Sequence, residues 1–217
     1  MKETKSDLHR NSAWLDLKTE KVRDTEWKND PKPYLGYPAP GKISSAESHL
    51  LYKIPQWLGS GNYADVGVYK GKSTAILGHG LTTAGYWGKV YSVDFFGTEP
   101  EGMEKFSDPT IPDLLTKYFE EQNLSPRLSI MKGDSSFSGH KLQVLKTMLR
   151  FVFLDADHSY EGTKRDFDIW SKMITKGGMI AFHDCDFYGV DQTIKEMNKK
   201  QWEFVRQIFS IKLFRKV

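Results

Sequence analysis

Residues 62–81, NYADVGVYKGKSTAILGHGL, constrain the fold of this chain more than any other segment. They predict a short buried strand, then a glycine turn, then a helix. Gly67 and Gly71 lie in the turn, where glycine permits a positive φ or a close approach of backbone. The helix after the turn presents free N–H groups at its start. In an open α/β sheet, this carboxyl end of the first strand is where a nucleotide-like ligand binds.

The spacing of this turn indicates which ligand it suits. Asp65, Gly67, Gly71 and Ser73 form the pattern DxGxxxGxS. It differs from the dinucleotide pattern GxGxxG and from the phosphate-binding loop GxxxxGK[ST]. An acid in front of the turn repels phosphate and attracts an ammonium group. S-adenosylmethionine has an amino group, a sulfonium and a ribose but no phosphate, and therefore fits this pattern.

Strand-like and helix-like segments alternate along most of the chain. Expected strands are 64–68, 89–95, 127–131, 150–155 and 179–183, and expected helices are 44–58, 73–81, 112–122, 141–148, 161–174 and 191–199. The alternation predicts an α/β fold with a doubly wound, mostly parallel, Rossmann-like sheet. The runs WEFVRQIF and IKLFRKV are separated by about a turn, so they predict a C-terminal antiparallel hairpin that brings the sheet to seven strands.

The chain divides into two parts by composition. Residues 1–42 are polar, rich in proline and poorly periodic, which predicts an N-terminal arm or lid, with Trp14, Trp27, Tyr34 and Tyr37 available to pack onto another surface. Residues 43–217 are expected to form the ligand-binding domain.

Composition limits the partners and the compartment. Lys and Arg number 31 and Asp and Glu 28, giving a net charge of 31 − 28 = +3, a balance that neither demands nor excludes nucleic acid. The sequence contains no base-flipping tetrad of the Asn/Asp-Pro-Pro-aromatic kind, so nucleic acid is an unlikely partner. Cys185 is the only cysteine, so the sequence predicts no intrachain disulfide and a reducing compartment. The sequence shows no apolar run of membrane-spanning length and no signal-peptide core at its start. We therefore expect a cytoplasmic protein without a membrane partner.

Polar residues follow the other expected strands as well. Asp94 ends the second strand, 94 − 71 = 23 residues after Gly71, a spacing at which a carboxylate accepts the hydroxyls of a ribose. The later strand ends contribute Gly133, Asp134, Ser135, Asp155, Asp157, His158, His183 and Asp184. Parallel strands bring these ends to one rim of the sheet.

With these motifs, residues 44–217 resemble the class I S-adenosylmethionine-dependent methyltransferases, and more closely the branch of catechol, sugar and macrolide O-methyltransferases. The segment ADVGVYKGKS is similar to the first motif of that family. The resemblance implies a cofactor site made of Asp65, Gly67, Tyr69, Gly71, Ser73, Asp94, Gly133, Asp134, Ser135 and Asp155. Asp94 would hold the ribose and residues 133–135 the adenine.

Many members of this branch bind Mg²⁺ through acids after the fourth and fifth strands. Those positions correspond here to Asp155, His183 and Asp184, and the histidine departs from the oxygen ligands that Mg²⁺ prefers. The alternatives are an ion held by Asp155 and Asp184 alone, a softer ion, or no ion. The resemblance places the catalytic base at His158, which stands where the catechol enzymes have a lysine, or at Asp157, which stands where the sugar enzymes have an aspartate.

The sequence therefore predicts an S-adenosylmethionine-dependent O-methyltransferase that acts on a small-molecule hydroxyl, a sugar or a natural product, with or without a divalent metal. The alternatives are an N-methyltransferase or another transferase on this fold without metal, and an inactive binding or scaffold protein. The acceptor is not encoded in a motif, since a fold does not fix a substrate. Assembly into a homo-oligomer is left open.

Overall fold

The structure, a computed structural model, describes residues 32–39, 41–98 and 108–217. Its strands are β1 (Asn62–Val66), β2 (Val90–Asp94), β3 (Leu128–Lys132), β4 (Leu149–Leu154), β5 (Ile174–Phe182), β6 (Trp202–Ile208) and β7 (Ile211–Lys216). They form one sheet in the order β3-β2-β1-β4-β5-β7-β6. β1 to β5 pair in parallel, and β7 runs antiparallel to β5 and β6. The predicted sheet and its C-terminal hairpin are confirmed.

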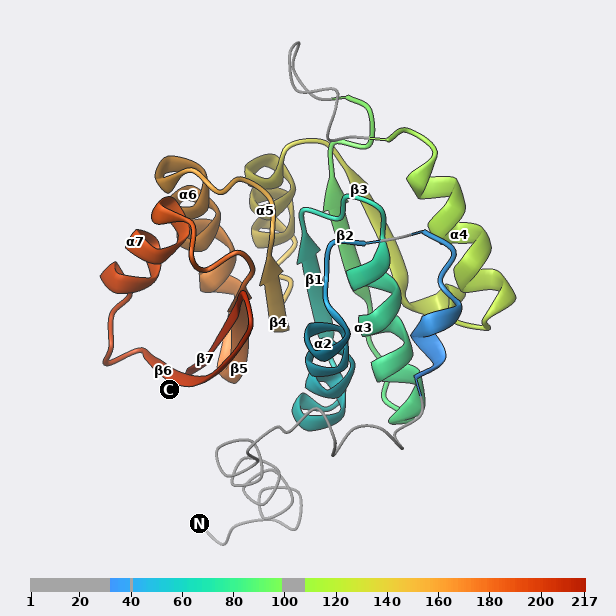
Figure 1. Ribbon diagram of the computed structural model, residues 1–217, viewed down its shortest axis with the longest axis horizontal. Helices are drawn as coiled ribbons and strands as arrows, with labels where there is room; N and C mark the ends of the chain where they lie inside the picture. The colour runs from blue at the N-terminus through green and yellow to red at the C-terminus, as the bar shows by residue number, and fades with distance from the viewer. Residues whose placement is uncertain (1–31, 40, 99–107) are drawn as a thin grey trace, which may run out of the picture.

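Helices cover both faces of the sheet (Figure 1). They are α2 (Ser45–Leu58), α3 (Lys72–Thr83), α4 (Ile111–Glu121), α5 (Ser135–Val144), α6 (Tyr160–Trp170) and α7 (Tyr188–Glu196), with a short 3-10 helix η1 (Pro33–Gly36) before them. Side chains of α2 and α3 pack in one core on the sheet, and side chains of α5, α6 and α7 pack in another. These two cores fix the sheet between two helical layers.

The central strand β4 shows why the sheet needs both layers. Phe151 and Phe153 point into the core beneath α2 and α3, while Val152 and Leu154 point into the core beneath α5, α6 and α7. Successive side chains of a strand face opposite sides. A strand with apolar residues on both faces is therefore stable only when both faces are covered.

The helix α2 begins where the sequence predicts a capping box. The Ser44 side chain accepts the Glu47 backbone N–H, and the Glu47 carboxylate accepts the Ser44 backbone N–H in return. The helix continues past Pro55 and ends at Leu58, where Gly59 takes a φ of 81°. This capping box fixes the position of Glu47, which also reaches the functional rim described below.

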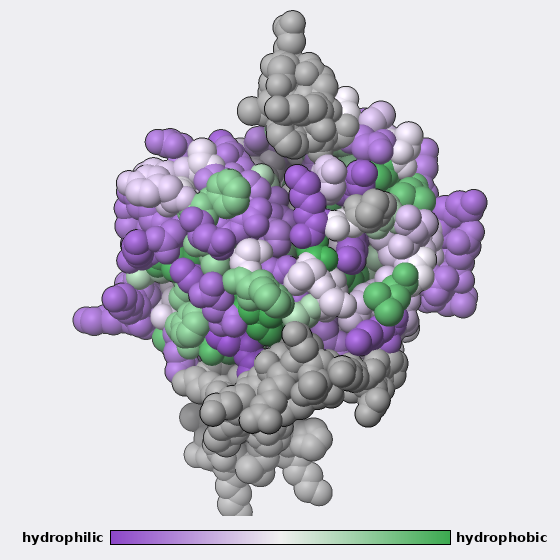
Figure 2. Space-filling view, viewed as in Figure 1, coloured by the Kyte–Doolittle hydropathy of each residue, from purple (hydrophilic) through white to green (hydrophobic). Residues whose placement is uncertain are grey.

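The helix expected over residues 141–148 lies instead at Ser135–Val144, so this boundary prediction was wrong. The Asp134 side chain accepts the backbone N–H groups of Ser136 and Phe137 and starts the helix there. The apolar residues Val144 and Met148 of the predicted segment are both exposed. Figure 2 shows that the hydrophobic surface on this face of the molecule is divided into separate small areas among hydrophilic residues.

The described part of the expected arm packs onto the domain. Tyr34 and Tyr37 are buried, and the Tyr37 hydroxyl donates to the Lys70 carbonyl at 2.6 Å. Trp14 and Trp27 lie outside the described residues, and the division at residues 42/43 stays a prediction. Within the ranges that the structure describes, no helix is both long and apolar enough to cross a membrane.

Strand order changes direction at the centre of the sheet. From β1 the chain proceeds to β2 and β3 on one side, then returns to place β4 on the other side of β1. In an open α/β sheet, ligands bind beyond the carboxyl ends of the strands at such a switch point. The candidate functional residues should therefore gather beyond β1 and β4.

Candidate functional site

The segment between β1 and α3, which we call the glycine turn (residues 67–71), is held in an unusual backbone conformation. Gly67, Tyr69 and Gly71 take φ values of 92°, 50° and 87°. A Cβ atom on Gly67 would lie 2.2 Å from the carbonyl oxygen of Asp155, so glycine is required there by the neighbouring strand end. Gly71 precedes α3, and its position provides no side chain to cap the first N–H groups of that helix.

Asp65 lies directly beneath the glycine turn and is fully buried. Its Oδ2 accepts the Ser73 hydroxyl at 2.7 Å and the Thr74 hydroxyl at 2.5 Å, whereas its Oδ1 has no hydrogen-bond partner among the described residues. Burial raises the pKa of Asp65 to about 7, although the two hydroxyls lower it. One oxygen thus remains for a cationic donor such as an ammonium group.

Asp94 ends β2 and connects the glycine turn to the neighbouring strand. Its carboxylate accepts the backbone N–H of Tyr69 at 2.8 Å and that of Phe96 at 3.4 Å. Burial raises the pKa of Asp94, although these N–H groups lower it. The sequence placed Asp94 at the ribose, and the structure brings it to the glycine turn; ribose binding itself stays a prediction.

The segment after β3 uses its polar groups to begin α5. Gly133 has a φ of 127° with open space at its Cβ position, and Asp134 caps the helix as described above. The Ser135 hydroxyl donates to Asp166 Oδ1 at 2.6 Å. Sequence reasoning missed Asp166, a buried acid on α6 whose pKa burial raises to about 6. The adenine contacts of residues 133–135 stay predictions.

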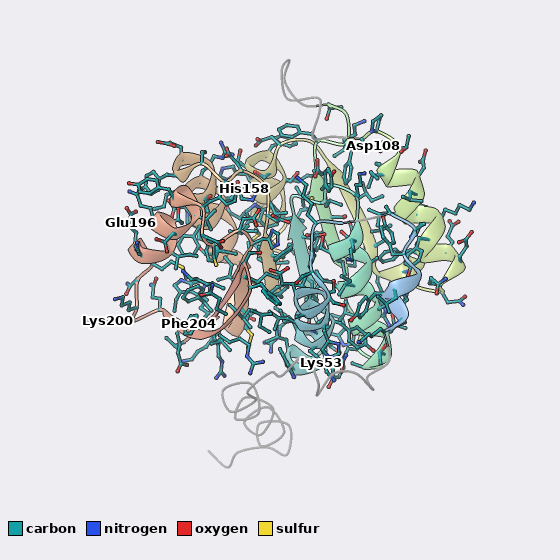
Figure 3. The ribbon with its side chains drawn as sticks, in the orientation of Figure 1. Lys53, Asp108, His158, Glu196, Lys200 and Phe204 are labelled. Carbon is teal, nitrogen blue, oxygen red and sulfur yellow. The ribbon has the colours of Figure 1, made fainter. Side chains whose placement is uncertain are left out.

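Three side chains meet beyond β4 and β5, and we call them the Asp–His rim: Asp155, His158 and Asp184. Their ligand-type atoms all lie within 4.8 Å of one another. His158 Nε2 is 3.4 Å from Asp155 Oδ1 and 3.4 Å from Asp184 Oδ2. The Asp155 carboxylate raises the pKa of His158, against the lowering effect of burial. Figure 3 shows His158 at the end of the molecule opposite Lys53 of α2.

The sheet register sets up the rim. Asp155 N–H donates to the Val66 carbonyl at 2.8 Å, and His183 N–H donates to the Leu154 carbonyl at 3.0 Å. The last ladder bonds of three adjacent strands thus lie beside the glycine turn. Asp184 follows with a φ of 48°, a left-handed conformation that aspartate tolerates better than most residues.

His183 stands behind the rim. It is buried, and its Nδ1 donates to Asp155 Oδ1 at 2.9 Å. Its Nε2 lies 3.9 Å from Glu47 Oε1. Burial lowers the pKa of His183, but the hydrogen bond to Asp155 and the nearby carboxylates outweigh burial and raise it. Glu47, which the sequence marked only as a helix cap, is thus also part of the electrostatic surroundings of the rim.

Asp157 does not join the other side chains. Its Oδ1 accepts the backbone N–H of Ser159 at 2.9 Å, just before α6 begins. Asp157 itself is exposed, although it borders a small hollow that Asp155, His158 and His183 also line. The structure therefore brings together four of the five residues that the sequence placed at the ends of β4 and β5, and turns the fifth toward the backbone.

Comparison with known proteins gives this geometry a context. A family model described as a methyltransferase domain matches residues 64–185, which is 122 of the 217 residues and more than half of the chain. A protein of Acanthamoeba polyphaga mimivirus, "Uncharacterized protein R132", is 34% identical over 59 residues. That match spans 27% of this chain and 27% of the viral protein, so the chain matches about a quarter of this curated relative.

Solved structures share the fold over most of the chain. CalS11, a calicheamicin methyltransferase, has a TM-score of 0.65 at 14% identity and covers 99% of this chain and 94% of its own. The O-methyltransferase from Bacillus cereus, solved in complex with SAH, has a TM-score of 0.60 at 17% identity, with 95% and 97% covered. A rRNA-methylase from Clostridium thermocellum, so named provisionally, has a TM-score of 0.57 at 17% identity, with 82% and 100% covered. At these identities the likeness concerns the fold.

Proposed function

We propose that this chain, which belongs to the methyltransferase family by its match over residues 64–185, transfers the methyl group of S-adenosylmethionine to a hydroxyl oxygen of a small molecule. The family match confirms the resemblance to methyltransferases seen in the sequence. A neighbour described as a TDP-rhamnose 3'-O-methyltransferase supports a sugar or natural-product acceptor. The rRNA-methylase neighbour has the same fold, so the acceptor has to be argued from the site.

The observation that carries this proposal is the contact between the glycine turn and the Asp–His rim. Gly67 lies against the carbonyl of Asp155 so closely that no Cβ atom fits between them. A methyl donor held by the turn and a hydroxyl held beside the Asp155 carboxylate would therefore be neighbours. Methyl transfer is an in-line displacement, and its rate depends mainly on holding donor and acceptor in this arrangement.

The cofactor residues are proposed as the sequence predicted them. Asp65 offers its unpartnered carboxylate oxygen to the ammonium group, and the N–H groups at the start of α3 face the carboxylate of the methionine part. Asp94 is proposed for the ribose and residues 133–135 for the adenine. Tyr69, Gly71, Ser73 and Asp155 complete the proposed set.

The acceptor hydroxyl has to lose its proton, because a neutral hydroxyl is a poor nucleophile. Of the two bases considered from the sequence, His158 lies in the rim, while Asp157 lies outside it and binds the Ser159 N–H through Oδ1. His158 Nε2 is therefore the proposed proton acceptor when no ion is bound. A divalent ion held by the rim would instead lower the pKa of the hydroxyl that it contacts.

Two measurements test this function. Calorimetry with S-adenosylhomocysteine should show binding, with a dissociation constant in the micromolar range. Incubation with S-adenosylmethionine labelled in its methyl group should then label hydroxyl-bearing small molecules, such as nucleotide sugars and polyphenols, and leave their amine analogues unlabelled. Labelled amines alone would establish the N-methyltransferase alternative, and a protein that binds no S-adenosylhomocysteine would be a scaffold rather than an enzyme.

The remaining expectations concern the surroundings of the enzyme. A cytoplasmic location, a homo-oligomeric state and a lid formed by residues 1–42 stay predictions. The buried position of Tyr37 against the glycine turn supports the idea that the end of the arm helps to enclose the cofactor.

A further inference from the structure

The Asp–His rim has the chemistry of a metal centre, and its nitrogen donor differs from the one expected from the sequence. His158 Nε2 is buried and makes no hydrogen bond within the part of the chain that the structure describes. It nevertheless lies 3.4 Å from an oxygen of Asp155 and from an oxygen of Asp184. At these distances the two carboxylates can pair with a protonated imidazole, and a cation held between the nitrogen and the two carboxylates would take the place of that proton.

His183 meets the same two carboxylates from the buried side. Its Nδ1 donates a hydrogen bond to Asp155 Oδ1 at 2.9 Å and lies 3.6 Å from Asp184 Oδ1, and its Nε2 faces Glu47 Oε1 at 3.9 Å. The Glu47 carboxylate accepts hydrogen bonds from the hydroxyl and N–H groups of Ser44 and Ser210, and these bonds hold it beside His183. An imidazole N–H bonded to a ligand carboxylate is the usual outer-shell arrangement, which orients the carboxylate and tunes its charge.

We propose that Asp155, His158 and Asp184 bind a divalent transition-metal ion through one nitrogen and two carboxylates, and that His183 is a positioning residue that orients Asp155. A borderline-soft ion accepts an imidazole ligand, whereas Mg²⁺ requires oxygen ligands in near-octahedral geometry. The ligand set therefore selects Mn²⁺, Co²⁺ or Zn²⁺ over Mg²⁺. This inference deepens the proposed function and rests on it, since the ion would meet the acceptor hydroxyl.

The neighbourhood of His158 is consistent with a fixed ligand. Its ring packs on that of Phe187 with centroids 5.2 Å apart, and Phe187 immediately precedes α7. The His158 side chain is 32% exposed, as is that of Asp184, so an ion at the rim would keep positions open to water or to an acceptor. His183, with a side chain only 5% exposed, has no such access.

The test compares Co²⁺ and Mg²⁺ affinities by calorimetry, using full-length protein stripped of metal with a chelator. Most sites bind Co²⁺ more tightly than Mg²⁺, so the diagnostic quantity is how a variant changes the ratio of the two affinities. The substitution His158→Asp makes the ligand set all-oxygen, and the ratio should fall by at least about tenfold. His158→Asn provides the same change without an added charge, and thermal unfolding reports whether each variant folds.

His183→Gln should weaken both ions by about 10–100-fold, as for loss of an outer-shell partner, and leave their ratio unchanged. His140→Asp, an exposed position on α5, is the matched control and should change neither affinity. A ratio that falls in His183→Gln but not in His158→Asp would overturn the assignment, as would wild-type protein that binds neither ion. S-adenosylhomocysteine binding, measured in the same samples, reports separately on the proposed methyl transfer.

Discussion

The glycine turn and the Asp–His rim lie side by side, yet they are built differently. In the turn, the Asp65 oxygen Oδ2 and the Asp94 carboxylate accept hydrogen bonds from the turn and from the start of α3. In the rim, His158 Nε2 makes no hydrogen bond among the described residues and meets only the carboxylates of Asp155 and Asp184, at 3.4 Å. The turn is therefore largely preorganised, with Asp65 Oδ1 left without a partner in the described part of the chain, whereas the rim is held together mainly by the attraction between charged groups.

Removing the rim imidazole should have the largest effect. For His158→Ala we expect turnover to fall by about 10²–10⁴-fold, as for loss of a general base, and a comparable loss if the imidazole holds an ion. Asp157→Asn should change turnover by less than about tenfold, because an amide oxygen can still accept the Ser159 N–H. The measurement uses the acceptor found in the labelling experiment. Equal losses in both variants would place Asp157 in the chemistry after all.

The next largest effect is expected on the stability of the protein, at the contact between the glycine turn and the Asp–His rim. Gly67→Ala introduces a Cβ atom 2.2 Å from the Asp155 carbonyl at a φ of 92°, and should lower the free energy of unfolding by about 2–5 kcal/mol. Gly85→Ala is the matched control, because Gly85 has a φ of 67° but open space around it, and should cost about 1–2 kcal/mol. Urea unfolding measures both. Equal costs would mean that the turn and the strand end are not tightly coupled.

On the turn side, Asp94→Ala should weaken S-adenosylhomocysteine binding by about 1.5–3 kcal/mol, the range for a hydrogen bond to a charged group. The loss has two sources, the ribose hydroxyls and the Tyr69 N–H that Asp94 holds in place. Asp113→Ala, in the first turn of α4, serves as the control in the same calorimetric titration. Unchanged affinity in the Asp94 variant would remove this residue from the cofactor site.

Asp65 should give the turn a pH dependence. Its pKa is about 7 in the folded protein and near the ordinary 3.8 when unfolded, so the folded state holds this proton more tightly. The free energy of unfolding should therefore decrease as the pH rises from about 4 to about 7, by at most about 1.4 kcal/mol per pH unit from this group. Asp65→Asn should flatten that slope in denaturant unfolding followed across the pH range. A slope unchanged by the substitution would show that Asp65 is ionised throughout.

The smallest effect concerns the arm. Tyr37→Phe removes the hydroxyl that donates to the Lys70 carbonyl at the glycine turn, and should cost about 0.5–1.5 kcal/mol of folding free energy. Tyr160→Phe removes an exposed hydroxyl bonded to Glu196 and should leave stability unchanged. Thermal unfolding compares the two. A Tyr37 variant as stable as wild type would show that the arm is not anchored through this bond.

The sequence by itself determined the sheet and the glycine turn. The alternation of strand and helix periods, the apolar run of β4 and the spacing from Gly71 to Asp94 are signals that can be read along the chain without knowledge of tertiary contacts. Even so, the start of α5 was predicted at residue 141, whereas the helix begins at Ser135, where the Asp134 side chain caps it. Asp166, which accepts the Ser135 hydroxyl, has no local signal that separates it from a solvated acid.

Only the tertiary structure decided how the two histidines meet the two carboxylates. The sequence put His183 in a metal-ligand position and His158 in a base position; in the fold both approach Asp155 and Asp184, but the His158 side chain is partly exposed and that of His183 is buried. Their orientations depend on packing against distant residues: Glu47 of α2 stands behind His183, and Phe187 supports His158. The direction of an imidazole is set by contacts between elements far apart in the chain, and for that reason the sequence could name the residues of the rim but not assign their roles.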